Sequence, residues 1–212
     1  IRKVKFKSFR SFYELATAKI WIDNCRKHDY ILKRKEQYYI QTWHSCLRLK
    51  KIEADAIDLL PKDYIRNAKA DSKKMDLLTV GCGFSEEMYN RVFWYNGKKL
   101  RCGTPRCDLF FNENDKKYVK DTFLKQYNIN ADTKIILYAP TFKKSSNEII
   151  IDYEKIIEKL LKYDKYIFLV RFHPISKNTI KSSKNVINVT DYPDIQELIA
   201  TCDFMITDYS GL

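Results

Sequence analysis

The chain has 212 residues, of which 45% are hydrophobic, and it carries a formal net charge of +12. This length indicates one large domain or two small ones, with enough apolar side chains for a packed core. No stretch approaches the roughly eighteen consecutive apolar residues of a membrane span, and charges interrupt the first residues too often for a secretory signal. These features predict a cytoplasmic protein.

The positive charge predicts an anionic partner, and charge alone does not decide among nucleic acid, an acidic membrane surface and a phosphate-rich substrate. The lysines and arginines form local clusters but accompany no nucleic-acid-binding motif, which argues against nucleic acid. A surface of solvated lysines without a partner is the alternative. The six cysteines include no C-x-x-C pair, so we expect free thiols and no metal site.

The first half of the chain predicts one α/β unit. Residues 38–43 (YYIQTW) are typical of a strand, and residues 55–80 of a helical stretch that leads to another short strand. Residues 84–95 predict a helix that Ser85 caps.

Turn-forming residues follow this unit, namely Gly97, Gly103 and Pro105. A charged helix is expected over residues 114–129, before a new sheet begins. We therefore expect a domain boundary near Asn112, with one domain over residues 1–111 and a second over residues 112–212.

The second half predicts a parallel sheet. Short apolar segments rich in β-branched residues indicate buried strands at residues 134–140, 166–172, 185–190 and 204–210. Residues 152–163 and 193–202 predict helices with one apolar face each: Ile156, Ile157, Leu160 and Leu161 in the first, Ile195, Leu198, Ile199 and Cys202 in the second. Pro193 suits the first turn of the second helix. Strands that alternate with helices favour a parallel sheet, which binds ligands at the carboxyl ends of its strands.

Polar residues stand at or just beyond the ends of four expected strands. They are His44, Thr141, His173 and the segment from Thr207 to Ser210. Hydroxyls and free backbone N–H groups at such an edge suit phosphate, because donors and helix dipoles both favour negative charge. Asp208 fits this role less well, and a turn or helix cap is its expected role.

The segments YYIQTWHSCLRLKK, RCGTPRCDLF, ILYAPTFK, VRFHP and DYPDIQELIATCDFMITDYSG occur here in the order and spacing of the CDP-glycerol glycerophosphotransferases, which include teichoic acid primases and polymerases. The resemblance covers residues 38–212. It implies an α/β fold of two Rossmann-like parallel-sheet domains, similar to the glycosyltransferase B fold. Residues 1–111 would form the acceptor side, and residues 112–212 the CDP-glycerol side. Because the chain starts without Met and stops after an expected strand, we expect a piece of a longer protein whose second domain is truncated at its carboxyl end.

The resemblance also implies roles for individual residues. His44 takes the place of the histidine in a WHGTPLKK-like segment, and we expect it to act as a general base on the attacking hydroxyl. His173 and Arg171 would stabilise the negative charge of the departing CMP, His173 as a second catalytic residue. Thr141, Thr207 and Ser210 would bind the donor phosphates. The implied reaction is the transfer of glycerol phosphate from CDP-glycerol to a hydroxyl of a lipid-linked cell-wall polymer, and it requires no cofactor besides that substrate.

Departures from the family pattern leave alternatives open. Ser45, Cys46 and Leu47 replace the usual Gly-Thr-Pro, Cys107 replaces an asparagine, and Gly211 replaces a serine. A related transferase of CDP-ribitol or of a nucleotide sugar is one alternative, and a binding module without catalysis is another. A lipid-linked acceptor and the basic surplus together predict peripheral docking on the anionic inner face of the cell membrane.

Overall fold

The computed structural model describes residues 2–44, 51–141, 153–160, 162, 165–173 and 180–208. The chain forms two compact units, Ile1–Thr104 and Pro105–Leu212. Each unit contains a four-stranded sheet within the described residues, and every strand pairing in both sheets is parallel. The predicted α/β class with parallel sheets is therefore confirmed.

The strands of the first sheet lie in the order in which they occur in the chain: β1 (Ile20–Asp23), β2 (Tyr38–Gln41), β3 (Leu77–Val80) and β4 (Lys99–Arg101). The strand predicted over residues 38–43 ends at Gln41. Trp43 has a φ of +55°, in the left-handed region, whereas strand residues have a negative φ. The chain therefore turns sharply just before His44.

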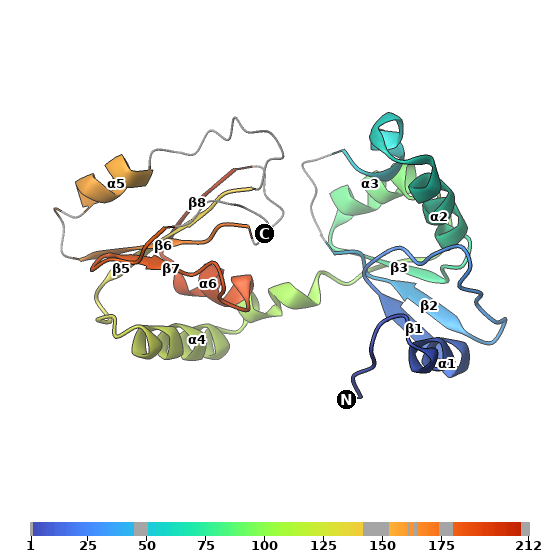
Figure 1. Cartoon of the computed structure of the whole chain (residues 1–212), viewed down its shortest axis with the longest axis horizontal. Coiled ribbons are helices and arrows are strands. Elements are labelled where there is room, and N and C mark those ends of the chain that lie inside the picture. The colour runs from blue at the N-terminus through green and yellow to red at the C-terminus, as the bar shows by residue number, and fades with distance from the viewer. Residues whose placement is uncertain are drawn as a thin grey trace. The chain divides into compact units, whose positions relative to one another are not determined.

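The helical elements of this unit are α1 (Phe9–Thr17), the 3-10 segment η1 (Glu53–Leu59), α2 (Lys62–Ser72) and α3 (Gly83–Val92). Figure 1 shows α2 and α3 on one side of the sheet and α1 on the other. The helix predicted to start at a Ser85 cap starts earlier, because Cys82 is its N-cap. Ser85 is buried inside the first turn, where its hydroxyl lies 3.2 Å from the Cys82 sulfur. The Ser85 cap was thus wrong.

The second sheet has the order β7 (Val186–Asn188), β6 (Tyr166–Val170), β5 (Lys134–Ala139), β8 (Phe204–Thr207). The first strand of this sheet in the chain, β5, lies inside the sheet. The next two strands, β6 and β7, follow on one side of β5, and β8 pairs with its other side. Both faces of β5 are covered, since side chains alternate along a strand. Ile135, Leu137 and Ala139 pack with Phe123 and Leu198 on one face. On the other face, Ile136 and Tyr138 lie in the cluster that Ile156 and Ile157 cover.

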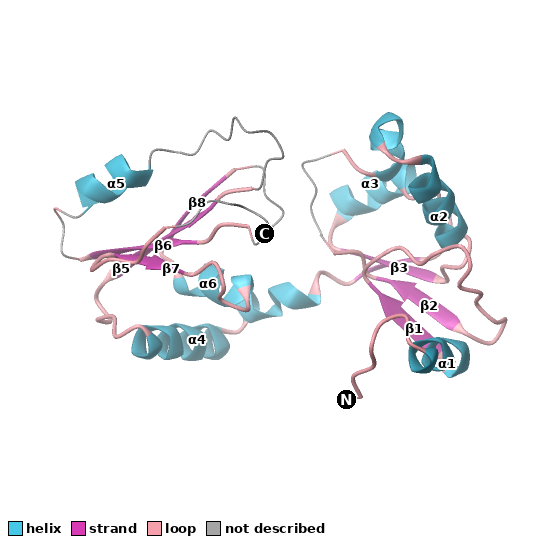
Figure 2. Cartoon of the chain, viewed as in Figure 1, coloured by secondary structure: helices cyan, strands magenta, loops and turns pink. Residues whose placement is uncertain are grey.

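The helices of the second unit are α4 (Glu113–Gln126), α5 (Tyr153–Leu160) and α6 (Ile195–Thr201), which follow the 3-10 segment η2 (Pro105–Phe111). The helices α4 and α6 cover one face of the sheet and α5 covers the other (Figure 2). The predicted apolar face of α6 is confirmed, while Leu161 of the first helix lies outside the described residues. Pro193 is not in the first turn of α6, because Asp194 is its N-cap and accepts a hydrogen bond from the Gln196 amide.

The segment η2 belongs to the second unit because it packs on α4 and α6. The division of the chain therefore falls between Thr104 and Pro105, several residues before the boundary expected near Asn112. Among the described helices, none is long and apolar enough to cross a membrane.

Replacing Leu137 by alanine should destabilise the second unit, because this β5 side chain is fully buried. The expected loss in unfolding free energy is about 2–5 kcal/mol, from lost apolar burial and the cavity left behind. Urea unfolding followed by far-UV circular dichroism measures it. Tyr118→Ala on α4 is the control, since this side chain is 72% exposed and its removal should change stability by less than about 0.5 kcal/mol. Equal effects of the two substitutions would contradict the assigned core.

Candidate functional site

The carboxyl edge of the second sheet brings Thr141 and Asp208 together, although 67 positions separate them in sequence. Thr141 follows β5 and Asp208 follows β8, and these strands are neighbours. Strand order reverses between them, and α/β sheets bind ligands outside the carboxyl ends of strands at such a point. This edge is therefore the candidate ligand site of the second unit.

The hydroxyls at this edge already donate hydrogen bonds within the protein. The Thr141 amide N–H donates to Asp208 Oδ1 at 2.9 Å, and the Thr141 hydroxyl donates to the same oxygen. The Thr207 hydroxyl donates to the Ala139 carbonyl at 2.7 Å. Asp208 thus links the ends of β5 and β8, a role that the sequence pattern did not indicate. Ser210 lies outside the described residues.

Arg171 and His173 follow β6 on either side of the buried Phe172. Arg171 is half-buried, and its Nη1 donates to the Tyr192 carbonyl at 2.6 Å, in the loop after β7. Burial lowers the pKa of the Arg171 guanidinium, and the nearby Asp194 carboxylate opposes that effect. His173 is exposed. The cation of Arg171 is thus directed toward the loop after β7, whereas Thr141 follows β5, the neighbour of β6 on its other side.

His44 lies at the surface of the first unit, in the loop after β2. Its Nδ1 is 2.9 Å from the Asn24 carbonyl oxygen, which belongs to the loop after β1. A carbonyl only accepts hydrogen bonds, so Nδ1 carries the hydrogen and the neutral ring has its lone pair on Nε2. The ring stacks on Trp43 with centroids 4.3 Å apart. His44 is thus held in the form that can accept a proton at Nε2.

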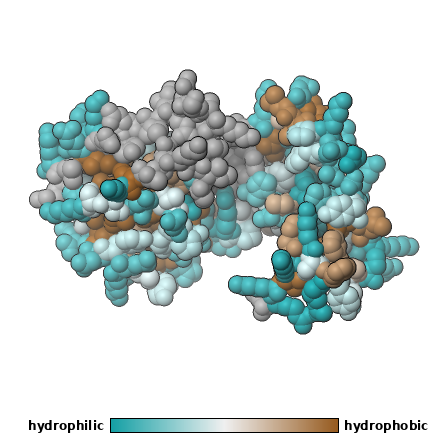
Figure 3. Space-filling model, viewed as in Figure 1, coloured by the Kyte–Doolittle hydropathy of each residue, from teal (hydrophilic) through white to brown (hydrophobic). Residues whose placement is uncertain are grey.

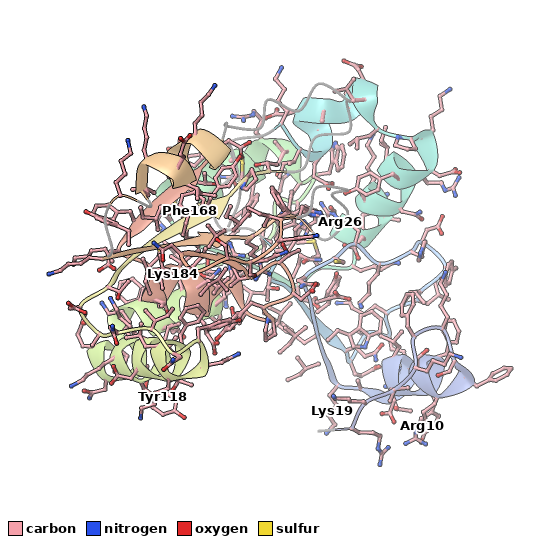
Figure 4. All side chains as sticks on the ribbon, turned by 60° about the vertical axis from the view of Figure 1, so that its left-hand side comes forward. Arg10, Lys19, Arg26, Tyr118, Phe168 and Lys184 are labelled. Atoms are coloured by element: carbon pink, nitrogen blue, oxygen red, sulfur yellow. The ribbon has the colours of Figure 1, made fainter. Side chains whose placement is uncertain are left out.

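A buried group of charged side chains packs against the Trp43 ring through Arg26. The carbon of the Arg26 guanidinium lies 5.5 Å from the centroid of the Trp43 ring and 4.4 Å from the centroid of the Phe93 ring. Arg26 is labelled in Figure 4. Its Nη2 donates to Glu53 at 3.1 Å and its Nη1 to Asp71 at 3.3 Å, and all three side chains are at most 5% exposed. Sequence reasoning missed this network, because isolated charged residues at these spacings usually lie on solvated faces.

Burial raises the pKa of the Asp71 carboxyl, and the Arg26 charge opposes that rise. The Lys27 amide and the Tyr39 hydroxyl also donate to Asp71, at 3.2 Å and 3.4 Å. Among the described residues, Arg26 is the cation that pairs directly with both carboxylates, Glu53 and Asp71.

A family model described as CDP-Glycerol:Poly(glycerophosphate) glycerophosphotransferase matches residues 1–212. The chain belongs to this family. It is 32% identical to the teichoic acid poly(glycerol phosphate) polymerase of Staphylococcus epidermidis, over 99% of this chain and 31% of that protein. It is 29% identical to the teichoic acid glycerol-phosphate transferase of Staphylococcus aureus, over 97% of this chain and 56% of that protein. A teichoic acid poly(ribitol-phosphate) polymerase of Bacillus spizizenii is also 29% identical, over 94% of this chain and 34% of that protein.

Solved structures of the wall teichoic acid polymerase TagF share the fold of this glycerophosphotransferase-family chain. One is 29% identical with a TM-score of 0.82, over 99% of this chain and 55% of that chain. A variant of the same polymerase soaked with CDPG has a TM-score of 0.81, over 99% of this chain and 53% of that chain. The chain thus matches about half of the polymerase structure, and it spans about a third to a half of its curated relatives.

Replacing Arg26 by methionine should cost about 3–5 kcal/mol of unfolding free energy, because it leaves two buried carboxyl groups without a cation. Urea unfolding followed by tryptophan fluorescence measures this, since Trp21, Trp43 and Trp94 all lie in the first unit. Arg66→Met is the matched control: Arg66 also pairs with two carboxylates, but its side chain is 64% exposed. It should lose less than about 1 kcal/mol. A small loss in Arg26→Met would refute the dependence on Arg26.

Proposed function

We propose that the protein carrying this chain transfers glycerol phosphate from CDP-glycerol to a hydroxyl of a lipid-linked cell-wall polymer and releases CMP. Membership of the glycerophosphotransferase family supports this reaction, as does the identity to glycerol-phosphate polymerases. The observation that carries the proposal is the hydrogen bond from His44 Nδ1 to the Asn24 carbonyl. It leaves Nε2 as a base at the end of a parallel strand, where such folds do their chemistry.

His44 acts as the general base in this proposal. The acceptor hydroxyl oxygen attacks the phosphorus that bears glycerol, and its proton passes to His44 Nε2. The bond between this phosphorus and the bridging oxygen breaks, and CMP leaves with the bonding electrons. A positioned base contributes about 10²–10⁴-fold to such a rate.

The second unit holds the donor in this proposal. Phosphoryl transfer depends mostly on positioning and on charge neutralisation at the leaving group. Arg171 and His173 neutralise the phosphate of the departing CMP. Thr141, Thr207 and Ser210 bind the donor phosphates, and a Thr141 hydroxyl that donates to phosphate must first give up its bond to Asp208.

We assign the two units to the two halves of a glycosyltransferase B-like enzyme. Residues up to Thr104 form the acceptor side, which contains His44. Residues from Pro105 onward form the CDP-glycerol side, which contains Arg171 and the β5–β8 edge. The similarity to TagF over nearly the whole chain supports this assignment.

CDP-ribitol is the second candidate donor. A ribitol-phosphate polymerase and a ribitol-phosphate primase match the chain at 29% and 28% identity, close to the values of several glycerol-phosphate relatives. Both donors carry the same cytidine and pyrophosphate groups, so His44 and Arg171 would serve either one. Turnover of CDP-ribitol with no turnover of CDP-glycerol would favour this candidate.

Replacing His44 by glutamine should lower CMP release from CDP-glycerol by about 10²–10⁴-fold, because the transferred proton loses its acceptor. The assay uses radiolabelled CDP-glycerol, the full-length protein and a lipid-linked acceptor. His28→Gln is the matched control, since His28 is also exposed and also stacks on a neighbouring ring, that of Tyr30. Wild-type turnover in His44→Gln would sink the assignment of the base. Binding of CDP-glycerol without any turnover would instead favour a module that has lost catalysis.

The lipid-linked acceptor and an anionic membrane surface are the proposed partners, and the N-terminal segment is the proposed contact. Phe6 and Phe9 are 78% and 96% exposed, and apolar and hydrophilic side chains alternate over this part of the surface (Figure 3). The same segment, residues 2–14, carries five basic residues and one acidic residue, namely Arg2, Lys3, Lys5, Lys7, Arg10 and Glu14.

A cavity of about 510 Å³ with mostly apolar walls opens beside this segment, between Phe6, Phe12 and Ile31. Exposed aromatic residues among cations are typical of surfaces that lie in a membrane interface.

Replacing Lys5 and Lys7 by glutamine should weaken binding to vesicles rich in anionic lipid by about 1 kcal/mol per lysine. Co-sedimentation at low and high salt measures this, and wild-type binding should fall as salt rises. In the control variant, glutamine replaces Lys117 and Lys125, two exposed lysines of α4. This variant should bind the vesicles like the wild type. Binding that high salt leaves unchanged would contradict an electrostatic contact.

A further inference from the structure

Three successive carbonyl groups, at the end of β1 and in the loop that follows it, accept hydrogen bonds from the end of β2 and from the loop after it. The Asp23 carbonyl accepts from the Thr42 amide at 2.9 Å. The Cys25 carbonyl accepts from the Gln41 side chain at 3.1 Å. Between them, the Asn24 carbonyl accepts from His44 Nδ1 at 2.9 Å. The acceptor of the catalytic imidazole thus lies in the middle of a segment that is fixed on both sides.

Gln41 holds both loops through one side-chain amide. It is the last residue of β2 and is fully buried. Its Nε2 donates to the Cys25 carbonyl, and its Oε1 accepts from the Trp43 amide at 2.9 Å. Trp43 has a φ of +55°, which is unfavourable for a bulky side chain and persists only where neighbouring contacts fix it. The bond from Gln41 is one such contact, and it directs the chain into His44.

Gln41 also connects these loops to the buried charges. Its Nε2 donates to the Tyr39 hydroxyl at 2.8 Å, and that hydroxyl in turn donates to Asp71. The position therefore needs a donor toward Cys25 and Tyr39 and an acceptor toward Trp43. A glutamine provides both in one planar group, whereas a methionine of similar size provides neither.

We propose that Gln41 is a positioning residue that fixes the tautomer and the orientation of His44. It holds the Asn24 carbonyl within hydrogen-bond distance of His44 Nδ1. The hydrogen therefore stays on Nδ1 and the lone pair stays on Nε2. Without the hydrogen bond from Nδ1 to Asn24, the imidazole adopts the tautomer with hydrogen on Nε2, and this tautomer cannot accept a proton at Nε2. The inference rests on the proposed function in one respect, namely that His44 is the base.

The decisive variant is Gln41→Met, and Gln37→Met is its matched control. Gln37 directly precedes β2 at the other end of the strand and is 3% exposed. It also joins loops, since its Nε2 donates to the Leu15 and Ala18 carbonyls at 2.8 Å and 2.6 Å, and its Oε1 accepts from the Arg34 amide. Both substitutions remove a buried amide, one at each end of β2, but only the Gln41 amide contacts the loop that contains His44.

The first readout is the nitrogen NMR spectrum of the full-length protein labelled with ¹⁵N in histidine, recorded where the imidazoles are neutral. The signal that disappears in His44→Gln identifies His44. We expect hydrogen on Nδ1 in the wild type and in Gln37→Met, and hydrogen wholly or partly on Nε2 in Gln41→Met. An unchanged tautomer in Gln41→Met would overturn the proposal.

The second readout is turnover of CDP-glycerol. In Gln41→Met, kcat should fall about 10- to 100-fold, within the range of general base catalysis, while the KM for CDP-glycerol stays unchanged. Gln37→Met should keep the wild-type kcat. If Gln41→Met fails to fold, Gln41→Glu replaces it, because the carboxylate keeps the acceptor for Trp43 and removes the donor to Cys25. The tautomer alone decides the role of Gln41, so a protein without turnover would count against the proposed function and not against this inference.

Discussion

Parallel strand pairing is the constraint on which both candidate sites depend. In a parallel sheet all strands end at the same edge, so residues that follow different strands meet there. This edge places His44 next to Asn24, 20 positions away, and Thr141 next to Asp208, 67 positions away. In an antiparallel arrangement alternate strands would end at opposite edges, and neither pair could form.

The two units hold these edges in different ways. In the second unit, β5 is buried on both faces by apolar side chains from three helices, so its end is fixed by packing. In the first unit, Arg26 packs on the Trp43 ring and pairs with the buried Glu53 and Asp71. The edge of this sheet is therefore fixed by paired charges and hydrogen bonds. Buried polar groups need a specific partner for each donor and acceptor, which gives directional control over a side chain such as His44.

The sequence predicted the elements whose residues carry a clear period and missed those that do not. The β-branched runs of β5 and β6 and the apolar face of α6 were found, because burial on a sheet or a helix face demands these patterns. The strands β1 and β4 were missed, since their few residues mix apolar and charged side chains at the surface. The sequence placed His44, Arg171 and Thr207 at or just beyond the ends of strands, and they lie there. Their partners at Asn24, Tyr192 and Ala139 are backbone carbonyls, which every residue has and no pattern reveals.

Hydrogen–deuterium exchange of the full-length protein with and without CDP-glycerol tests most directly whether the carboxyl edge of the second sheet binds the donor. Bound nucleotide should slow amide exchange in peptides that contain Thr141, Arg171 and Asp208. Peptides from the opposite edge of the same sheet, which contain Thr133, Lys165 and Asp203, should exchange as before. Protection at the opposite edge, with none at Thr141 and Asp208 under saturating CDP-glycerol, would contradict the account.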